Sequence, residues 1–410
     1  MSRTPLAAIV TVGSELTEGL RIDSNMALIA REISGLGFRV TEAVSVGDDV
    51  VHLSLVLRRL TTQCELVVTT GGLGPTHDDV TREATALALG LELHEDKEIA
   101  AWLAGFARRH VEAASRDAVL TQAQVLTGAK VLTPRTGTAP GQDVPTPAGR
   151  LILLPGPPHE MSEMLERALA GYTRSMASPR DLGVTGMPES DVQLAAQRAL
   201  AGREDITLTV LARPGDVRVL LIDAGAGQLG LDEMAAAVAA ELGAACYTTA
   251  GGTLAEETVA LLTRRSMTLS TAESCTGGLV SAALTDVPGV SDVFLGGIVS
   301  YANSVKSGIL EVPDGLLAQF GAVSEQTAAA MAEGVRKITG SDIAVSVTGV
   351  AGPGGGTPEK PVGLVWFAIS HGGGTDVFEL RFLGGSRDSL RARATAKALD
   401  IVRRHLLDAE

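Results

Sequence analysis

The chain has 410 residues, a formal net charge of −14, 45% hydrophobic residues and only 3% aromatic residues. A chain of this length exceeds what one hydrophobic core usually supports, so we expect two or three domains. The acidic balance and the few aromatic side chains argue against direct nucleic-acid binding, and no apolar run is long enough to span a membrane. Three widely spaced cysteines indicate neither a disulfide framework nor a structural zinc site, and they fit a reducing cytoplasm.

Apolar strands alternate with amphipathic helices from residue 6 onward. The expected strands are 6–12, 38–46, 65–70 and 150–156, and the expected helices are 24–37, 50–63, 78–90 and 158–172. Alternation of this kind predicts crossover units and a mostly parallel sheet with helices on both faces. We therefore expect a three-layer α/β/α domain over residues 1–172.

A glycine-rich loop, "VVTTGGLGPTHDD", places Gly71, Gly72 and Gly74 between a strand and a helix. Glycines there let backbone N–H groups approach an anion closely, and the helix N-terminus adds favourable partial charge. The run lacks the G-K-[ST] of a P-loop and the G-x-G-x-x-G spacing of a dinucleotide fold. We expect a ligand that carries a phosphate or a similar anion.

Two neighbouring aspartates, Asp78 and Asp79, follow this loop. They could hold a divalent cation that bridges phosphate oxygens, or one of them could cap the next helix, and the sequence leaves both readings open. Glu15 follows the first strand, and ligands collect at the carboxyl ends of parallel strands. Glu15, Asn25 and Thr76 therefore join the expected nucleotide-binding group.

Residues 173–251 read as a small α+β module, with strands expected at 206–212 and 216–224 and helices at 190–202 and 231–243. Its segment Gly227-Gln228-Leu229-Gly230 has the GxxG pattern of a KH-type RNA clamp. That segment carries no Lys or Arg, and the module has ten acidic residues against six arginines. We therefore do not expect it to bind phosphates.

Residues 252–410 return to α/β alternation. Helices are expected at 253–265, 277–286, 324–340 and 387–407, and strands at 267–272, 294–300, 342–349, 362–370 and 377–383. The stretch "TAESCTGG" at 271–278 lies where a strand turns into a helix, which is a common place for an active site. No cluster with metal-ligand spacing is visible in this third segment.

Motifs along nearly the whole chain resemble those of the competence/damage-inducible protein CinA family. "TTGGLGPTHDDVTREA" and "LPGPPHEM" resemble its molybdopterin-binding-like domain, and "TAESCTGG", "GGIVSYANSVKSGIL" and "GGSRDSLRARA" resemble its C-terminal deamidase domain. The resemblance implies that residues 252–410 convert nicotinamide mononucleotide to nicotinate mononucleotide and ammonia without a cofactor. It also implies a homodimer whose residues 1–172 hydrolyse ADP-ribose to AMP and ribose 5-phosphate with a divalent metal ion. No Nudix-type acidic helix is visible, so this second activity would use the glycine loop and the Asp78–Asp79 pair.

Hydrolysis of a primary amide needs an attacking oxygen or sulfur, a base and donors for the oxyanion. The histidines of the third segment, His371 in a turn and His405 near the C-terminal end, are not well placed for a Ser-His-Asp triad. A lysine base is the simpler inference. Lys306 follows strand 294–300 together with Tyr301, and partial burial would lower the pKa of its amine; a solvated surface lysine is the alternative.

Within "TAESCTGG", Ser274 is the preferred nucleophile and Cys275 is its rival. A reactive thiolate usually needs an adjacent histidine, whereas a buried free cysteine is a common small apolar filler. The resemblance implies Ser274 as the nucleophile, assisted by Lys306 and Tyr301. It further implies substrate contacts at Thr276, Gly277, Gly278, Ser291, Thr348, Gly349 and Arg387. Arg387 also has an independent rationale, because a guanidinium at a helix start can bind phosphate through two hydrogen bonds; an ordinary surface arginine is the alternative.

Two other functions stay open at this point. The first domain alone would suit a molybdopterin-handling protein, although the attached third segment weighs against that reading. The family's name suggests a non-catalytic role in DNA uptake or repair, which would require a protein partner because the acidic charge opposes direct DNA binding.

Overall fold

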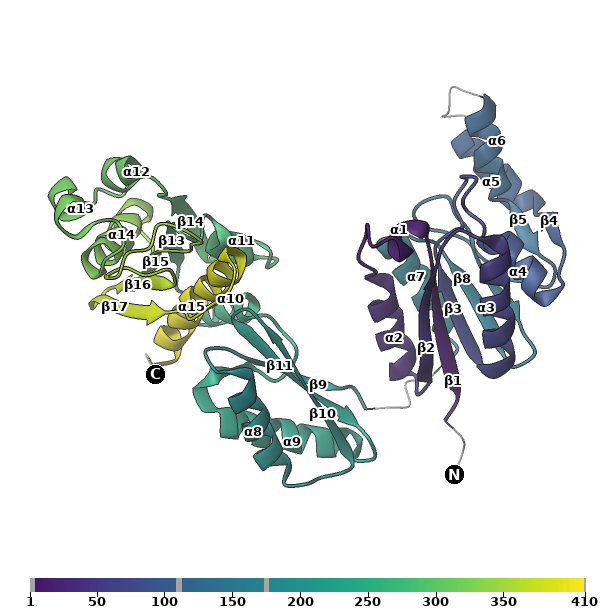
Figure 1. The fold of residues 1–410 in the computed structure, drawn as a ribbon, viewed down its shortest axis with the longest axis horizontal. Coiled ribbons are helices and arrows are strands. Elements are labelled where there is room, and N and C mark those ends of the chain that lie inside the picture. Colours follow the sequence, from purple (N-terminus) through teal and green to yellow (C-terminus); the bar gives the residue numbers. More distant parts are fainter. Residues whose placement is uncertain (1–3, 108–112, 173–176, 409–410) are drawn as a thin grey trace. The chain divides into compact units, whose positions relative to one another are not determined.

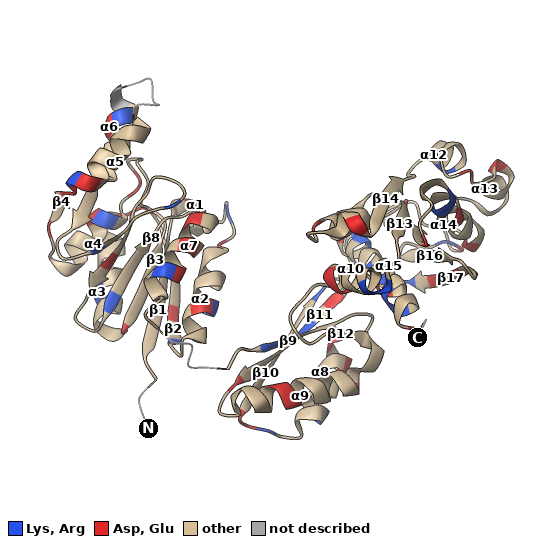
Figure 2. Cartoon of the chain, turned by 180° about the vertical axis from the view of Figure 1, so that it is seen from behind, with Lys and Arg blue, Asp and Glu red and all other residues tan. Residues whose placement is uncertain are grey.

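The computed structural model describes residues 4–107, 113–172 and 177–408, and the chain forms two compact units, Met1–Ala177 and Ser178–Glu410 (Figure 1). The predicted start of the middle module, at residue 173, lies outside the described residues. Within the described ranges, none of the helices is both long and apolar enough to cross a membrane. Figure 2 shows acidic and basic residues interspersed over both units.

The first unit is built on a six-stranded sheet with the order β2-β1-β3-β8-β7-β6. Its strands are β1 (Leu6–Val12), β2 (Arg39–Val46), β3 (Leu66–Thr70), β6 (Lys130–Leu132), β7 (Gly141–Pro145) and β8 (Arg150–Leu154). Strands β2, β1, β3 and β8 run parallel, and β7 and β6 form an antiparallel edge. The sequence predicted the four parallel strands and made no prediction for the antiparallel edge.

Helices cover both faces of this sheet because successive side chains of a strand point to opposite sides. The covering helices are α2 (Asn25–Gly35), α3 (Val50–Gln63), α4 (Thr81–Leu89) and α7 (Pro158–Leu169). Ile9 of β1 lies in one core with α2 and α7, whereas its neighbour Val10 lies in a second core with α3 and α4. This is the three-layer α/β/α arrangement that the sequence predicted.

Residues 91–107 and 113–129 form a smaller part of the first unit, for which we made no prediction from the sequence. It contains the helices α5 (Lys97–Ala107) and α6 (Ala113–Thr121) and the antiparallel strand pair β4 (Leu93–Glu95) and β5 (Gln124–Leu126). Leu103, Val119 and Val125 pack together in a core of their own. A short helix, α1 (Ser14–Thr17), follows β1 at the carboxyl edge of the large sheet.

The second unit begins with an antiparallel sheet of order β10-β11-β9-β12. Its elements are β9 (Arg180–Val184), α8 (Glu189–Leu200), β10 (Ile206–Arg213), β11 (Asp216–Asp223), α9 (Gly227–Leu242) and β12 (Cys246–Thr248). Helices α8 and α9 pack side by side against the sheet (Figure 1). The GxxG segment at 227–230 forms the first turn of α9, so it is helical.

A five-stranded sheet of order β14-β13-β15-β16-β17 forms the rest of the second unit. Its strands are β13 (Leu269–Glu273), β14 (Phe294–Val299), β15 (Ile343–Gly349), β16 (Leu364–His371) and β17 (Gly374–Arg381). Its helices are α10 (Leu254–Arg265), α11 (Leu279–Thr285), α12 (Asn303–Gly308), α13 (Asp314–Phe320), α14 (Glu325–Thr339) and α15 (Arg387–Asp408). Strands β14, β13 and β15 are parallel, which brings the loops after β13 and β14 to the same edge.

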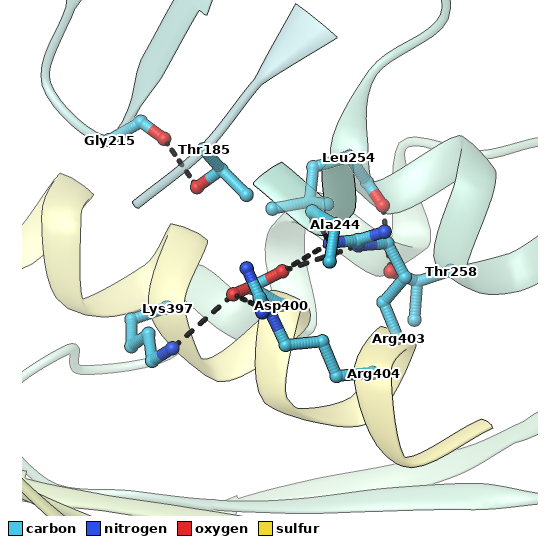
Figure 3. A network of polar contacts seen from close by, with 9 residues as sticks. All are labelled: Thr185, Gly215, Ala244, Leu254, Thr258, Lys397, Asp400, Arg403 and Arg404. Atoms are coloured by element: carbon cyan, nitrogen blue, oxygen red, sulfur yellow. Dashed lines mark hydrogen bonds and ion pairs between the residues drawn. The ribbon is translucent and has the colours of Figure 1, made fainter. Parts of the chain in front are cut away.

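A buried charge network joins α15 to the middle part of this unit (Figure 3). Asp400 is fully buried and accepts hydrogen bonds from Arg403 at 2.7 Å, Arg404 at 2.9 Å and Lys397 at 3.3 Å. Arg403 also donates to the carbonyl of Ala244, at 2.6 Å, in the turn that precedes β12. A buried carboxylate is tolerated only when such partners compensate its lost hydration, so this network fixes the position of α15.

Candidate functional sites

The first candidate site pairs Ser274, which follows β13, with Lys306 on α12. Lys306 Nζ lies 3.1 Å from Ser274 Oγ. The amine is fully buried and also donates to the backbone carbonyls of Ser300, at 2.6 Å, and Tyr301, at 3.3 Å. The predicted partnership of Ser274 with Lys306 is therefore present in the structure, and the alternative of a solvated surface lysine is wrong.

Burial lowers the pKa of the Lys306 amine, because the surrounding protein solvates an ammonium ion less well than water does. A neutral amine has two N–H donors and one lone pair. The carbonyls of Ser300 and Tyr301 accept the two N–H groups, which directs the lone pair toward the Ser274 hydroxyl. The arrangement suits a base that removes the hydroxyl proton.

The rival thiol, Cys275, lies in an environment that opposes thiolate formation. The side chain is buried and packs in the core with residues of α10, α11 and α15. Burial raises the pKa of the Cys275 thiol to about 12. Since the thiolate is the reactive form, Cys275 is an apolar filler at neutral pH, and Ser274 is the better nucleophile.

Glu273 organises the turn that carries Ser274, a role that the sequence analysis missed. Its fully buried carboxylate accepts hydrogen bonds from the backbone N–H groups of Gly278, Val280 and Ser281 and from the Ser281 hydroxyl, at 2.7–3.1 Å. A carboxylate at the N-terminus of α11 also interacts favourably with the helix dipole. The signal in the sequence was an acidic residue directly after the expected strand 267–272, at the start of a turn that contains two glycines.

The two glycines of this turn allow a backbone conformation that other residues rarely adopt. Gly277 and Gly278 have φ values of +61° and +97°, which are unfavourable for a residue with a Cβ atom. The N–H of Gly278 donates to Glu273, and the N–H of Gly277 donates to the carbonyl of Ser274 at 3.2 Å. Both amides are therefore already bonded within the turn, and a contact of these glycines with a substrate phosphate stays a prediction.

Tyr301 and Arg387 form a second polar pair beside the Ser274–Lys306 pair. Arg387 donates to the Tyr301 hydroxyl at 3.1 Å and to the carbonyl of Gly352 at 2.8 Å. Tyr301 is 62% exposed, and it contacts Lys306 through its carbonyl. The predicted proton shuttle between the Tyr301 hydroxyl and the lysine is therefore not formed here, because that hydroxyl faces the guanidinium.

The remaining predicted contacts of the second unit fall into two groups. Thr276 and Thr348 are fully buried; the Thr348 hydroxyl donates to the carbonyl of Ala322 at 2.6 Å, and the Thr276 hydroxyl has no partner among the described residues. Gly349 ends β15, where a Cβ atom would lie 2.7 Å from a backbone oxygen of β16. Ser291 lies in the turn before β14, at the edge opposite Ser274, so the structure does not bring it to this site.

The second candidate site is a cavity of about 420 Å³ in the first unit, at the carboxyl ends of β1 and β3. Every residue predicted for the N-terminal site lines it, namely Glu15, Asn25, Gly71, Gly72, Gly74, Thr76, Asp78 and Asp79. Gly71 and Gly72 have φ values of +101° and +64°, and a Cβ atom on Gly71 would lie 2.2 Å from the carbonyl oxygen of Val12. Only glycine fits this close approach of the loop to the end of β1.

The two aspartates of this cavity differ in their contacts. Asp79 accepts from the N–H of Gly74 at 2.7 Å and from the N–H and hydroxyl of Thr76 at 2.7 and 2.6 Å. It therefore holds the glycine loop, whereas the residue that precedes α4 is Val80, which makes no side-chain cap. The capping hypothesis is wrong for both aspartates. Asp78 is exposed and lines the cavity.

The cavity is also lined by three acidic residues that the sequence analysis did not predict. They are Asp23, Asp48 and Glu160. Oδ2 of Asp23 and Oδ1 of Asn25 are buried and unpartnered within the described part of the chain. Burial raises the pKa of the Glu160 carboxyl. Hard oxygen donors without partners are what a divalent cation of the Mg²⁺ type requires, so the donor set fits such an ion.

The fold and the sites thus define an α/β protein of two units, with a Ser–Lys pair in one and an acidic, glycine-lined cavity in the other. Residues 8–174 match the family model described as "Probable molybdopterin binding domain", and residues 252–406 match the CinA C-terminal domain. CinA-like proteins of Koribacter versatilis and Thermotoga maritima are 38% and 37% identical over 98% of this chain, and the match covers 100% and 98% of their own lengths. The chain belongs to the CinA family.

Solved structures that resemble this chain each cover only part of it. The crystal structure of competence/damage inducible protein CihA from Agrobacterium tumefaciens is 42% identical, with a TM-score of 0.37, and the match covers 38% of this chain and 93% of that chain. The protein CinA from Thermoplasma acidophilum is 31% identical, with a TM-score of 0.38, over 41% of this chain and 98% of that chain.

Proposed function

We propose that the second unit hydrolyses the carboxamide of nicotinamide mononucleotide to give nicotinate mononucleotide and ammonia. The observation that supports this most directly is the 3.1 Å approach of the buried Lys306 amine to the Ser274 hydroxyl. A serine activated by a neutral lysine is a known solution for acyl transfer from amides. The choice of nucleotide comes from the resemblance of the motifs, and Arg387 supplies a cation for its phosphate.

The reaction proceeds through an acyl-enzyme. Ser274 Oγ forms a bond to the carboxamide carbon while its proton passes to Lys306 Nζ. The resulting ammonium then protonates the amide nitrogen, the carbon–nitrogen bond breaks, and ammonia leaves. Water next gives a proton to Lys306 as its oxygen bonds to the acyl carbon, and the proton returns to Ser274 when the ester bond breaks. Lys306 thus acts first as base and then as acid in each half.

The test uses the full-length protein. Ammonia release from nicotinamide mononucleotide is measured for the wild type and for Ser274→Ala, in buffer treated with EDTA. We expect turnover by the wild type and a loss of turnover in the variant. Absence of turnover by folded wild-type protein would refute the proposed activity.

For the first unit we propose hydrolysis of ADP-ribose to AMP and ribose 5-phosphate with a divalent metal ion. The unpartnered oxygens of Asp23 and Asn25 and the exposed carboxylate of Asp78 support this, and these residues would hold the ion. When bound, the ion supplies positive charge to the diphosphate oxygens. The glycine loop lines the same cavity, and Asp79 holds its conformation through the N–H groups of Gly74 and Thr76, so the loop would lie beside the diphosphate. Release of AMP with and without added divalent ion tests the proposal.

A further inference from the structure

Two histidines and an aspartate of the second unit meet at the edge of the five-stranded sheet that is opposite to Ser274. His371 ends β16, Asp376 lies on β17, and His405 lies in the last turn of α15. In the antiparallel register His371 pairs with Gly374 and Ile369 pairs with Asp376, so His371 and Asp376 point to the same face of the sheet. That face packs against α15, because Ile369 shares a core with residues of that helix.

The three side chains are close enough to share one ion. His371 Nε2 lies 3.2 Å from an Asp376 carboxylate oxygen, and the two imidazole rings have their centroids 4.5 Å apart. One ligand atom from each residue lies within 4.8 Å of the others. Sequence spacing gave no sign of this group, since its members are separated by five and 29 positions and come from three different elements.

We propose that His371, Asp376 and His405 bind a divalent transition-metal ion of the Zn²⁺ class. Two imidazoles and one carboxylate form a donor set that suits Zn²⁺, and they leave at least one coordination position for water. The earlier expectation that residues 252–410 contain no metal-ligand cluster is corrected by this geometry. The ion would be distinct from the hard cation proposed for the first unit, whose donors are all oxygens.

Binding requires one rearrangement at His371. The N–H of Gly373 donates to Nδ1 of His371 at 3.2 Å, so Nε2 carries the ring proton and points it at Asp376. To coordinate through Nε2 the neutral ring must move that proton to Nδ1, and the N–H of Gly373 must turn to water. Gly373 is exposed at the tip of the hairpin, which makes this change small.

The site lies at the opposite sheet edge from the Ser274–Lys306 pair. Ser370, the residue before His371, pairs with Ala344 near the start of β15, whereas Ser274 follows the end of the parallel strand β13. The expectation that these histidines do not serve Ser274 is therefore confirmed. An ion here would tie the last turn of α15 to the β16–β17 hairpin, so its effect would be on the stability of the unit and not on the carboxamide chemistry.

Co²⁺, whose visible absorption reports nitrogen and oxygen coordination, is the probe. The full-length wild type and the variants His405→Gln, His371→Gln and Asp376→Asn are titrated with Co²⁺, with His94→Gln, an exposed histidine of the first unit, as the matched control. We expect each of the three variants to bind one Co²⁺ fewer than the wild type, while the control binds as many. Competition by Zn²⁺ should remove the same absorption band.

Two features make the experiment decisive. Asp376 is exposed, with 62% of its side-chain surface accessible, so Asp376→Asn keeps the fold even where a histidine variant loses stability. Equal Co²⁺ stoichiometry and equal spectra in the wild type and in Asp376→Asn and His371→Gln would overturn the proposal. Deamidation by the three variants should equal that of the wild type. Co²⁺ binding is measured by absorption, so this test can be interpreted even if the proposed amidase activity is absent.

Discussion

The two candidate sites differ in the sign of their ionisable groups and in how far these groups are buried. In the second unit a single lysine is fully buried without a carboxylate partner, and its hydrogen bonds go to two carbonyls and a hydroxyl. In the first unit several carboxylates line one open cavity, and two of the oxygen atoms there are unpartnered. In the first arrangement burial lowers the pKa of the Lys306 amine and so favours its neutral form, whereas the second gathers carboxylates whose charge an added cation would balance.

The largest effect is expected from removal of the Ser274 hydroxyl, which we propose as the nucleophile. Ser274→Ala should lower kcat for nicotinamide mononucleotide on the order of 10⁴-fold, as loss of a nucleophile does in other hydrolases. Cys275→Ala should change kcat by less than about tenfold, because the buried thiol is protonated at neutral pH. Ammonia release measures both. A dead Cys275→Ala variant beside a partly active Ser274→Ala variant would transfer the nucleophile to sulfur.

Removal of the buried amine comes next. Lys306→Met keeps the aliphatic stem but cannot accept a proton, so kcat should fall by roughly 10²–10⁴-fold with little change in KM. Wild-type kcat should rise with pH as the ammonium loses its proton, at a pH below the ordinary lysine value because burial lowers the pKa. That limb should vanish in the variant. Lys337→Met, an exposed lysine paired with Glu311, is the control.

The same lysine gives a stability signature. Between its lowered folded pKa and the unfolded value of about 10.4, the unfolded chain binds the proton and the folded chain does not. The wild-type free energy of unfolding therefore gains a contribution that rises with pH through this window. Denaturant melts at several pH values should show the rise in the wild type relative to Lys306→Met. Parallel pH dependence in the two proteins would mean that the folded lysine keeps its ordinary pKa.

In the first unit, substitutions of Asp78 and Asp79 should have different effects on hydrolysis and on thermal stability. Asp78→Asn should lower ADP-ribose hydrolysis by about 100-fold without changing Tm, because it removes an exposed carboxylate that we assign to the metal, and metal stabilisation of phosphoryl oxygens is worth several kcal/mol. Asp79→Asn should also lower Tm, and the free energy of unfolding should fall by about 1–3 kcal/mol, because the loop loses charge-assisted acceptors. Glu95→Gln is the exposed control. Unchanged hydrolysis in Asp78→Asn would remove that residue from the metal site.

The smallest expected effect concerns the phosphate. Arg387→Ala should raise KM for nicotinamide mononucleotide by roughly 10–100-fold and leave kcat nearly unchanged, since a ground-state contact is uniform binding. Arg381→Ala, an exposed arginine on β17 paired with Glu379, is the matched control. A lower kcat with an unchanged KM in Arg387→Ala would contradict this prediction. It would indicate that Arg387, through its contact with Tyr301, acts in the chemical step.

The sequence predicted the parts of the fold that have a regular period. The parallel strands of the first sheet, the five strands of the second sheet and most of the helices that cover these sheets were found, because their apolar residues recur at fixed intervals. Strands β9 and β12 and helices α12 and α13 were missed, since they have only three to seven residues and show no complete period. The insertion at residues 91–129 was missed for a similar reason, because its helices cover a small core of their own.

The candidate sites were partly predictable for a different reason. Glycine loops and strand ends mark where ligands collect, which located Ser274 and Gly71–Gly74. Sequence cannot show which groups a side chain contacts, so the Tyr301 hydroxyl was assigned to Lys306 although it faces Arg387. Glu273 was overlooked because a buried acid acquires its role from four donors that only the folded turn assembles.

Helix α15 contacts two different parts of the second unit, one near each of its ends. Near its start Arg391 donates to the carbonyls of Cys275 and Thr276, and near its end Arg403 donates to the carbonyl of Ala244. These two arginines stand about 18 Å apart along one stiff rod, since a helix rises about 1.5 Å per residue. One inserted residue between them would rotate one end by about 100° relative to the other. The number of residues between Arg391 and Arg403 therefore fixes the rotation between the turn that follows β13 and the turn that precedes β12. A change in that number would break one of the two contacts.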